Sequence, residues 1–277
     1  MTTLPPWLHR TLLKENSTKK ALSSCSVRTV CDEALCPNRL ECYSERQASF
    51  LLLGSFCTRS CGFCHVRHSD QPALPDPKEP EAVAECCAQL GLRHAVLTMV
   101  TRDDLEDGGA AHVAATVRAI RSRLPEITVE VLTSDFDGRA PSAALLLAEQ
   151  PEVFAHNLET VRSLTPKIRS KATYDGSLAF LQRLKEINPS QVTKSSLMVG
   201  FGETFAEVAA TLKDLHSVGV RMVTIGQYLQ PTPKQVTVKE WIHPDLFKAY
   251  EEAARTAGIN EVNAGPFVRS SYRARPL

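Results

Sequence analysis

Nine cysteines are the residues of this sequence best suited to chemistry, because six of them fall into two close groups. A zinc site usually needs four ligands in two Cys-x-x-Cys pairs, and the sequence has one such pair, Cys61–Cys64. Soft thiolates in threes are instead typical of iron–sulfur clusters that leave one iron for another ligand. The spacing therefore predicts two iron–sulfur sites, one on Cys31, Cys36 and Cys42 and one on Cys57, Cys61 and Cys64.

The remaining cysteines, Cys25, Cys86 and Cys87, have no ligand spacing, and we interpret them as packing or partly exposed thiols. A disulfide framework is not expected, because a chain of 277 residues can bury a sufficient core without cross-links. The start of the sequence also lacks an apolar signal core. These features favour a reducing compartment, and we predict a cytoplasmic protein.

The composition is that of an ordinary globular protein, with 43% hydrophobic and 23% charged residues. A formal net charge of +1, from 32 Lys and Arg against 31 Asp and Glu, argues against a nucleic-acid-binding protein that depends on a basic field. No apolar run approaches the roughly 18–20 residues of a membrane span, so we expect no membrane association.

Short apolar runs and helical segments alternate from Phe50 onward, which is typical of βαβ units and a parallel sheet. Strands are predicted at 50–54, 95–100, 128–133, 153–157, 195–200 and 222–228. Helices are predicted near 80–90, 109–124, 140–149, 176–187, 204–218 and 245–257. Six strand–helix pairs predict an α/β fold, an incomplete (β/α)6 TIM-like barrel, with its chemistry on the loops after the carboxyl ends of the strands.

This pattern divides the chain into three parts. Residues 1–49 are a cysteine-bearing N-terminal extension that wraps on the main domain, residues 50–260 are the barrel, and residues 261–277 are a C-terminal tail that folds back on it. The second cysteine group begins directly after the first strand, where a barrel places its chemistry. The open side of an incomplete barrel suits a large or protein-borne substrate.

The spacing Cys-x-x-x-Cys-x-x-Cys at 57–64, directly after a barrel's first strand, resembles that of the radical S-adenosylmethionine enzymes. Along most of its length the sequence also resembles the lipoyl synthase family. The matching segments are Pro6–Leu8, Glu33–Cys42, Arg102–Gly109, His156–Thr160, Thr193–Thr204, Gly226–Tyr228 and Gly265–Tyr272. Both cysteine groups followed by Arg-Ser-Ser-Tyr, in this order, are highly specific to that family.

The resemblance implies that Cys57, Cys61 and Cys64 hold three irons of a [4Fe–4S] cluster whose open iron binds S-adenosylmethionine. An electron from this cluster would cleave S-adenosylmethionine to a 5′-deoxyadenosyl radical. The protein is therefore expected to be a radical S-adenosylmethionine sulfurtransferase.

The family resemblance further implies a second, auxiliary [4Fe–4S] cluster on the first cysteine group, Cys31, Cys36 and Cys42. A serine of the Arg-Ser-Ser-Tyr motif supplies its fourth ligand in the family, and by position in the motif we assign Ser271. The auxiliary cluster is the family's sulfur source. Sulfur enters at C6 and C8 of an octanoyl chain amide-linked to a lysine, and a lipoyl group results.

Several residues at strand ends are candidates for contact with S-adenosylmethionine. Gly108 and Gly109 would let the backbone approach the cofactor, and a solvated loop with a helix start is the alternative. Asn157 and Glu159 follow the fourth strand, where a carboxylate can accept hydrogen bonds from ribose hydroxyls or the methionine ammonium; helix capping is the alternative. Arg169 is either a partner for a substrate or cofactor carboxylate or a surface charge.

Two segments depart from the usual family pattern. Ser134 stands where a proline usually precedes Asp-Phe, and the residues of the segment Pro231–Val236 differ from those usual in the family. We expect neither to touch a cluster ligand. Lys194 starts a strand, so its charge is expected at the end of the barrel away from the site.

The implied partners are octanoylated lipoyl domains or the glycine-cleavage H protein as substrate, an electron donor such as flavodoxin or ferredoxin, and an iron–sulfur carrier. Two other radical enzyme classes compete with this hypothesis. Relatives that thiolate tRNA would be expected to have an added RNA-binding domain and a basic surface, and biotin-forming relatives lack the leading cysteine group. A metal-binding sensor without turnover is the alternative from another class, but a zinc module needs far less scaffold than six βα units.

Overall fold

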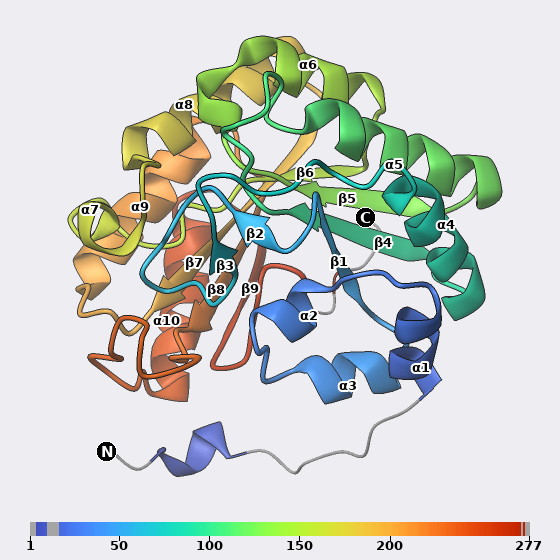
Figure 1. Cartoon of the computed structure of the whole chain (residues 1–277). Helices are drawn as coiled ribbons and strands as arrows, with labels where there is room; N and C mark the ends of the chain where they lie inside the picture. Colours follow the sequence, from blue (N-terminus) through green and yellow to red (C-terminus); the bar gives the residue numbers. More distant parts are fainter. Residues whose placement is uncertain (1–3, 10–16, 273, 275–277) are drawn as a thin grey trace.

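One parallel sheet of seven strands forms the centre of the described part of the chain (Figure 1). The structure is a computed structural model that describes residues 4–9, 17–272 and 274. The strand order is β1-β4-β5-β6-β7-β8-β9, so β1 and β9 are the two edges and the barrel stays open between them. The strands are β1 (Ser49–Leu52), β4 (His94–Met99), β5 (Thr128–Leu132), β6 (Val153–Ala155), β7 (Val192–Val199), β8 (Met222–Gln227) and β9 (Glu261–Gly265).

Helices follow the strands and surround the outer face of this sheet (Figure 1). They are α4 (Glu79–Leu90), α5 (Ala110–Arg123), α6 (Ala140–Ala148), α8 (Tyr174–Ile187), α9 (Phe205–Ser217) and α10 (Pro244–Thr256). The shorter elements are η1 (Pro6–Leu8), β2 (Phe56–Cys57), β3 (Arg67–His68), η2 (Phe136–Gly138) and α7 (Thr165–Ile168). The small β2–β3 ribbon carries the start of the second cysteine group.

The N-terminal extension contributes three short helices, α1 (Ser17–Ser24), α2 (Val30–Glu33) and α3 (Arg39–Ser44). They lie below the strands, near the β1 and β9 edges, in Figure 1. The extension is bound to the edge strand, because Thr29 bridges to Phe50 and Leu51 N donates to the carbonyl of Arg28 at 2.9 Å. The extension therefore packs on the barrel, as the sequence predicts.

The predicted incomplete barrel is confirmed, and each of its six strands lies where the sequence places it, within a few residues. One element is added. Residues 261–265, the start of the predicted tail, form β9, which pairs in parallel with β8. The tail thus completes the sheet before it turns toward the extension; residues 273 and 275–277 of the predicted tail lie outside the described residues.

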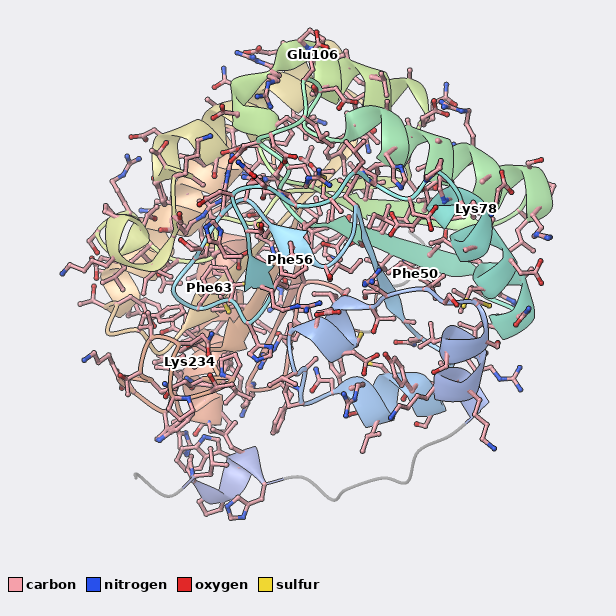
Figure 2. All side chains as sticks on the ribbon, in the orientation of Figure 1. Phe50, Phe56, Phe63, Lys78, Glu106 and Lys234 are labelled. Carbon is pink, nitrogen blue, oxygen red and sulfur yellow. The ribbon has the colours of Figure 1, made fainter. Side chains whose placement is uncertain are left out.

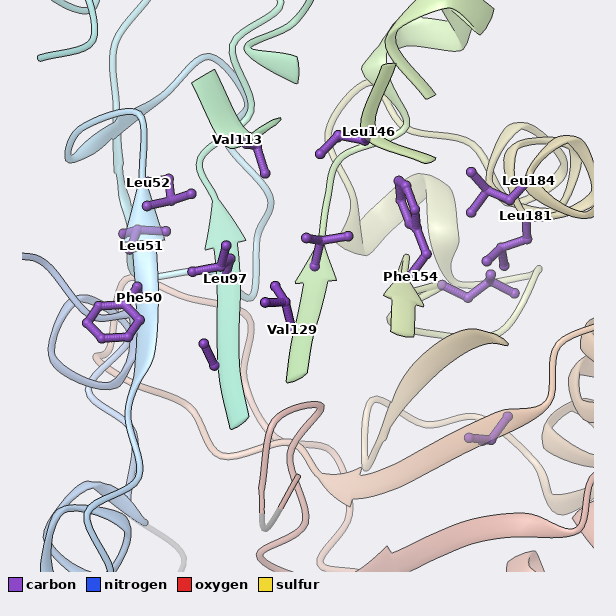
Figure 3. Packing of buried hydrophobic residues seen from close by; sticks show 14 of the residues in the cluster. Phe50, Leu51, Leu52, Leu97, Val113, Val129, Leu146, Phe154, Leu181 and Leu184 are labelled. Carbon is purple, nitrogen blue, oxygen red and sulfur yellow. The ribbon is translucent and has the colours of Figure 1, made fainter. Parts of the chain in front are cut away.

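Apolar side chains on the strands and helices make a large core, because parallel strands are covered by helices on the outer face (Figure 3). Leu97, Val129 and Phe154 from neighbouring strands are fully or almost fully buried there.

Polar residues fix the helix ends. Helix α9 starts with a capping box between Thr204 and Glu207, in which each side chain binds the backbone N–H of the other residue.

Candidate functional site

A cavity of about 520 Å³ lies at the carboxyl ends of the barrel strands. Its wall includes residues that follow β4 and β8, such as Thr101 and Tyr228. The three cysteines of the second group line the same cavity: Cys57, Cys61 and Cys64. The sequence-based expectation that this group faces the strand ends is therefore met.

Backbone contacts hold the segment that carries these cysteines. Gly62 N donates to the carbonyl of Ile168 at 2.9 Å, and Ser170 N donates to Cys61 Sγ at 3.4 Å. A Cβ at Gly62 would lie 2.8 Å from Val236 Cγ2, so only glycine fits this close approach. The position of the Cys61 thiol is thus fixed by the fold itself.

Burial controls the protonation of two of these thiols, those of Cys61 and Cys64. It raises the pKa of Cys64 to about 12, and the neighbouring Cys61 and Cys57 add to the shift. The pKa of Cys61 is also raised, again mainly by burial. The thiolates therefore need a bound cation to compensate their charge, and metal binding here releases protons.

Apolar side chains cover much of the remaining wall. They come from the extension, the second cysteine group's segment and β4, and include Val30, Leu35, Phe63, Val66 and Met99. Figure 2 shows Phe63 near the β2–β3 ribbon, together with Phe56 of β2. Such a wall keeps water away from part of the cavity and suits an alkyl chain.

Arg59, between the first two cysteines of this group, is buried and binds two carboxylates that the sequence did not single out. Its Nε and Nη2 donate to Asp103 at 3.0 and 2.9 Å, and Nη2 donates to Asp135 at 2.7 Å. Burial alone would raise the pKa of Asp135, but the hydrogen bond from Arg59 and the electrostatic interactions with His156 and Arg59 together outweigh it and lower the pKa to about 2. Arg59 thereby joins the cysteine segment to the loops after β4 and β5.

Asn157 and Glu159, predicted to contact S-adenosylmethionine, both line the cavity. Asn157 Nδ2 donates to Glu159 Oε1 at 3.1 Å, and Ser270 Oγ donates to Asn157 Oδ1 at 3.3 Å. Burial raises the pKa of Glu159, and the positive charge of Arg169 opposes that shift. Arg169 also lines the cavity, so the structure favours the pocket interpretation over the surface charge.

Gly108 and Gly109 are not brought to either cavity wall described here. Gly109 caps α5 with a φ of +91°, and a Cβ there would lie 2.4 Å from Leu53 Cδ1. A Cβ on Gly108 would lie 3.0 Å from Phe136 Cδ1. Positive φ and close packing account for both glycines, which agrees with the alternative of a helix start.

Cys31, Cys36 and Cys42 line a second, smaller cavity of about 40 Å³. Ser271, from the tail, lines it as well. Burial raises the pKa of Cys31 to about 12, and the nearby Cys36 adds to the shift. Cys31, Cys36 and Ser271 also belong to the wall of the larger cavity, so the two cysteine groups face adjoining spaces.

Two hydrogen bonds on either side of Ser271 tie the tail to the extension. Asn38 Nδ2 donates to the carbonyl of Phe267 at 2.6 Å, and the Tyr272 hydroxyl donates to Glu41 Oε1 at 2.9 Å. Asn38 and Glu41 lie within the first cysteine group. The fold therefore brings together Ser271 and a cysteine group that are distant in the sequence.

The cysteine groups surround volumes and do not converge on one point. Among the described residues, no three His, Cys, Asp or Glu side chains are placed to hold a single metal ion. The ligands of a [4Fe–4S] cluster bind different irons and must enclose the whole cluster.

One expectation about the departures from the family pattern is wrong. The segment Pro231–Val236 does touch a predicted ligand, because Gln235 Nε2 donates to the carbonyl of Cys64 at 3.2 Å. Val236 N also donates to the carbonyl of Gly62 at 2.9 Å. This segment supports the cysteine loop through two backbone carbonyls, a contact that sequence spacing does not reveal.

The three remaining cysteines come together between α1 and α4, outside both cavities. Cys86 and Cys87 are fully buried, and Cys25 Sγ donates to Gln89 Oε1 at 3.4 Å. Burial raises the pKa of Cys87 to about 12. These positions agree with the interpretation of packing thiols.

Comparison with known proteins identifies the family. The Radical SAM superfamily profile matches residues 51–215. The lipoyl synthase of Protochlamydia amoebophila is 48% identical over 275 residues, which cover 98% of this chain and 85% of that protein. The lipoyl synthase of Pelodictyon phaeoclathratiforme is 51% identical over 261 residues, which cover 94% and 88% of the two chains. The chain belongs to the lipoyl synthase family.

Membership in the lipoyl synthase family makes this chain a radical S-adenosylmethionine enzyme that inserts sulfur and uses S-adenosylmethionine and [4Fe–4S] clusters. Solved structures agree on the fold. SuiB of Streptococcus suis bound to S-adenosylmethionine has a TM-score of 0.62 at 11% identity and covers 81% of this chain and 52% of its own. Methylornithine synthase has a TM-score of 0.56 at 13% identity, covering 89% and 81%.

No helix in residues 4–9, 17–272 and 274 has both the length and the apolar composition needed to cross a membrane.

Proposed function

We propose that this chain inserts two sulfur atoms at C6 and C8 of an octanoyl chain that is amide-linked to a lysine of a partner protein, giving a lipoyl group. The observation that carries the proposal is the meeting of two cysteine groups at adjoining cavities, with a tail serine at one of them. Radical cleavage and sulfur donation need separate clusters that reach one substrate, and this geometry suits that need.

We assign Cys57, Cys61 and Cys64 as ligands of the radical S-adenosylmethionine cluster. All three line the larger cavity, and the surrounding backbone holds their segment in place. When bound, this cluster supplies the electron that cleaves S-adenosylmethionine, and the auxiliary cluster supplies the sulfur. The chain's own contribution is to hold three thiolates and leave one iron without a protein ligand.

The auxiliary cluster is assigned to Cys31, Cys36, Cys42 and Ser271. These four residues line one small cavity, so the Ser271 side chain is placed where its oxygen can act as a ligand. A serine oxygen is a harder ligand for iron than a thiolate, which makes this corner the weakest of the site and suits a cluster that gives up sulfur.

Asn157 and Glu159 are the proposed protein contacts of S-adenosylmethionine. Their hydrogen bond to each other orients the Glu159 carboxylate at the cavity wall, where it can accept hydrogen bonds from ribose hydroxyls or from an ammonium group. Gly108 and Gly109 keep an indirect role here, because they set the start of α5 and the loop that carries Asp103.

The substrate of this family is an octanoylated protein, and its chain would enter along the apolar wall. Leu35 is 46% exposed and lines the larger cavity, so it marks an apolar rim next to the auxiliary site. Lipoyl domains and the glycine-cleavage H protein are the proposed substrates. A flavodoxin or ferredoxin is the proposed electron donor, an iron–sulfur carrier the proposed source of clusters, and the cytoplasm the proposed location.

The test is an anaerobic assay with an octanoyl-lysine peptide, a strong reductant and S-adenosylmethionine. Two clusters predict about eight irons per chain. After reduction the product should be heavier than the substrate by two sulfur atoms, and its ring form should have two hydrogens fewer. Cys57→Ala should abolish 5′-deoxyadenosine, whereas Cys36→Ala should retain some of it and form no product.

Three outcomes would contradict the proposal. Zinc in place of iron in the anaerobically purified protein would exclude the enzyme function. Product from Cys36→Ala, or 5′-deoxyadenosine from Cys57→Ala, would reverse the assignment of the two groups. Cys87→Ala is the control, because this cysteine lies outside both cavities and should leave the iron content unchanged.

A further inference from the structure

A buried ion pair lies inside the barrel and has no part in the proposed function. Lys194 Nζ contacts the two carboxylate oxygens of Glu130 at 2.8 and 3.0 Å. Both residues are at most 3% exposed. Lys194 projects from the amino-terminal half of β7, as the sequence predicts, and Glu130 projects from the middle of β5.

His94 of β4 stands beside this pair with one nitrogen satisfied and one not. Its Nδ1 is 2.8 Å from Thr128 Oγ1, and the same hydroxyl is 3.2 Å from the carbonyl of Arg93. Because the contact with Nδ1 is the shorter of the two, we assign the Thr128 hydroxyl as the donor to Nδ1, which leaves the imidazole proton on Nε2. His94 Nε2 lies 3.9 Å from Glu130 Oε2, which is too long for a hydrogen bond.

The His94 side chain is only 8% exposed, and its Nε2 has no hydrogen-bond partner among the described residues. Asn38 Oδ1 is also buried and has no hydrogen-bond partner among the described residues. Leaving a buried polar atom unpaired costs about 1–3 kcal/mol, so native structures rarely do it without a reason. The two atoms belong to residues far apart in the sequence, yet both residues line the small cavity shared by Cys31, Cys36, Cys42 and Ser271.

We propose that His94 is a positioning residue of the auxiliary site, whose Nε2–H donates a hydrogen bond to the group bound there. The inference rests on the proposed function, because it takes the first cysteine group and Ser271 as ligands. Asn38 Oδ1 lies at the same cavity as a second unpaired polar atom. Only the His94 nitrogen can act as a donor, so it is the atom that we assign to the acceptor atoms of the bound group.

The ion pair gives His94 its fixed orientation. Thr128 holds Nδ1, and the Glu130 carboxylate, anchored on both oxygens by Lys194, stands on the Nε2 side. Glu130 and Lys194 neutralise each other, so the imidazole lies beside a polar ion pair that has no net charge. Replacing a residue that hydrogen-bonds to a metal ligand without binding the metal itself typically changes metal affinity by about 10–100-fold.

The test uses the full chain with Cys57, Cys61 and Cys64 all replaced by alanine, so that the auxiliary site alone holds iron. In this background His94→Phe removes both nitrogens, His94→Asn keeps a polar group near the Nδ1 position, and His94→Gln keeps one near the Nε2 position. The readouts are iron per chain, the rate of iron removal by a chelator, and the electron paramagnetic resonance spectrum after reduction.

We expect His94→Phe and His94→Asn to lose iron to the chelator at least about tenfold faster and to shift the spectrum. His94→Gln should restore most of both properties. His112→Gln is the matched control: His112 Nε2 pairs with Glu79 at 2.7 Å outside both cavities, so its loss should change neither readout.

The possible failures are distinguishable. If the triple alanine background with His94 intact holds no iron, the proposed auxiliary site fails, and this inference fails with it. If the background holds about four irons but His94→Phe behaves like it in chelation rate and spectrum, the proposed function stands and the role of His94 is refuted. If His94→Gln is as impaired as His94→Phe, packing rather than the Nε2 contact explains the effect, and the inference is likewise refuted.

Discussion

Arg59 links the chemistry of the larger cavity to the fold through one side chain. Its guanidinium binds Asp103 and Asp135, which lie in loops after two different strands. Neutralising either Asp103 or Asp135 would leave part of the buried Arg59 charge without compensation. Such a change typically costs about 3–5 kcal/mol of stability. The stability of this part of the barrel should therefore depend on the ionisation of both carboxylates.

Asp135 gives this dependence a pH range. Its pKa in the folded protein is about 2, below the usual value near 3.8, so its ionised form stabilises the fold above about pH 4. That contribution is lost as the pH falls from about 4 toward 2. We expect the difference in unfolding free energy between the wild type and Asp135→Asn to shrink by on the order of 2 kcal/mol over this range.

Chemical denaturation at several pH values in that range measures this difference. Asp70→Asn is the control, because the Asp70 side chain is 91% exposed and is not part of the Arg59 cluster. A constant difference between the wild type and Asp135→Asn from pH 4 to pH 2 would refute the role assigned to Arg59.

The sequence identifies some site residues and not others for a physical reason. The second cysteine group sits within eight positions on one loop, so its spacing alone predicts a shared site. Arg59 meets partners that are 44 and 76 residues away, and that pairing depends on how β4 and β5 are ordered in the sheet. Gly108 and Gly109 stand close in sequence to cavity residues, but positive φ and packing direct them elsewhere.

At the scale of elements, the tail that follows β9 is a bridge between the two ends of the chain. Its contacts with the extension place Ser271 at the first cysteine group. The sequence does not predict β9, because the residues of 261–265 are only partly buried and show no apolar run. Edge strands of this kind are specified by their neighbour β8 more than by their own residues.

Tyr272→Phe tests this bridge by removing one hydroxyl. The hydrogen bond to the Glu41 carboxylate is of a type worth about 1.5–3 kcal/mol, so the tail should dock roughly tenfold more weakly or worse. We expect the iron content to fall from about eight toward about four per chain and lipoyl product to drop, while 5′-deoxyadenosine still forms.

Tyr174→Phe is the control for this experiment, because its hydroxyl donates to Asp214 at 2.9 Å and so loses a similar hydrogen bond elsewhere. Iron content in Tyr272→Phe equal to that of Tyr174→Phe would show that the tail needs no such anchor.

At the scale of the whole molecule, the extension and the barrel share one core. Leu22 and Tyr43 of the extension belong to the same buried cluster as Phe50 and Leu90 of the barrel. Tyr43 is 1% exposed, and its hydroxyl donates to Asp32 Oδ2 at 2.7 Å. We therefore expect the two parts to unfold together, although the sequence divides them at residue 49.

Tyr43→Ala should lower the free energy of unfolding by about 3–5 kcal/mol, the range for loss of a large buried aromatic. Hydrogen exchange should rise in peptides from both α3 and the barrel strands. Faster exchange confined to the extension would show instead that it is a separate unit that opens alone.

The bond between Asn38 and Phe267 spans 229 residues, and this separation has a consequence for how the enzyme matures. A growing chain can present the thiols of residues 57–64 long before the ribosome has made Ser271. On the proposed ligand assignment, the auxiliary site can therefore be completed only after translation has passed Ser271 and β9 has paired with β8.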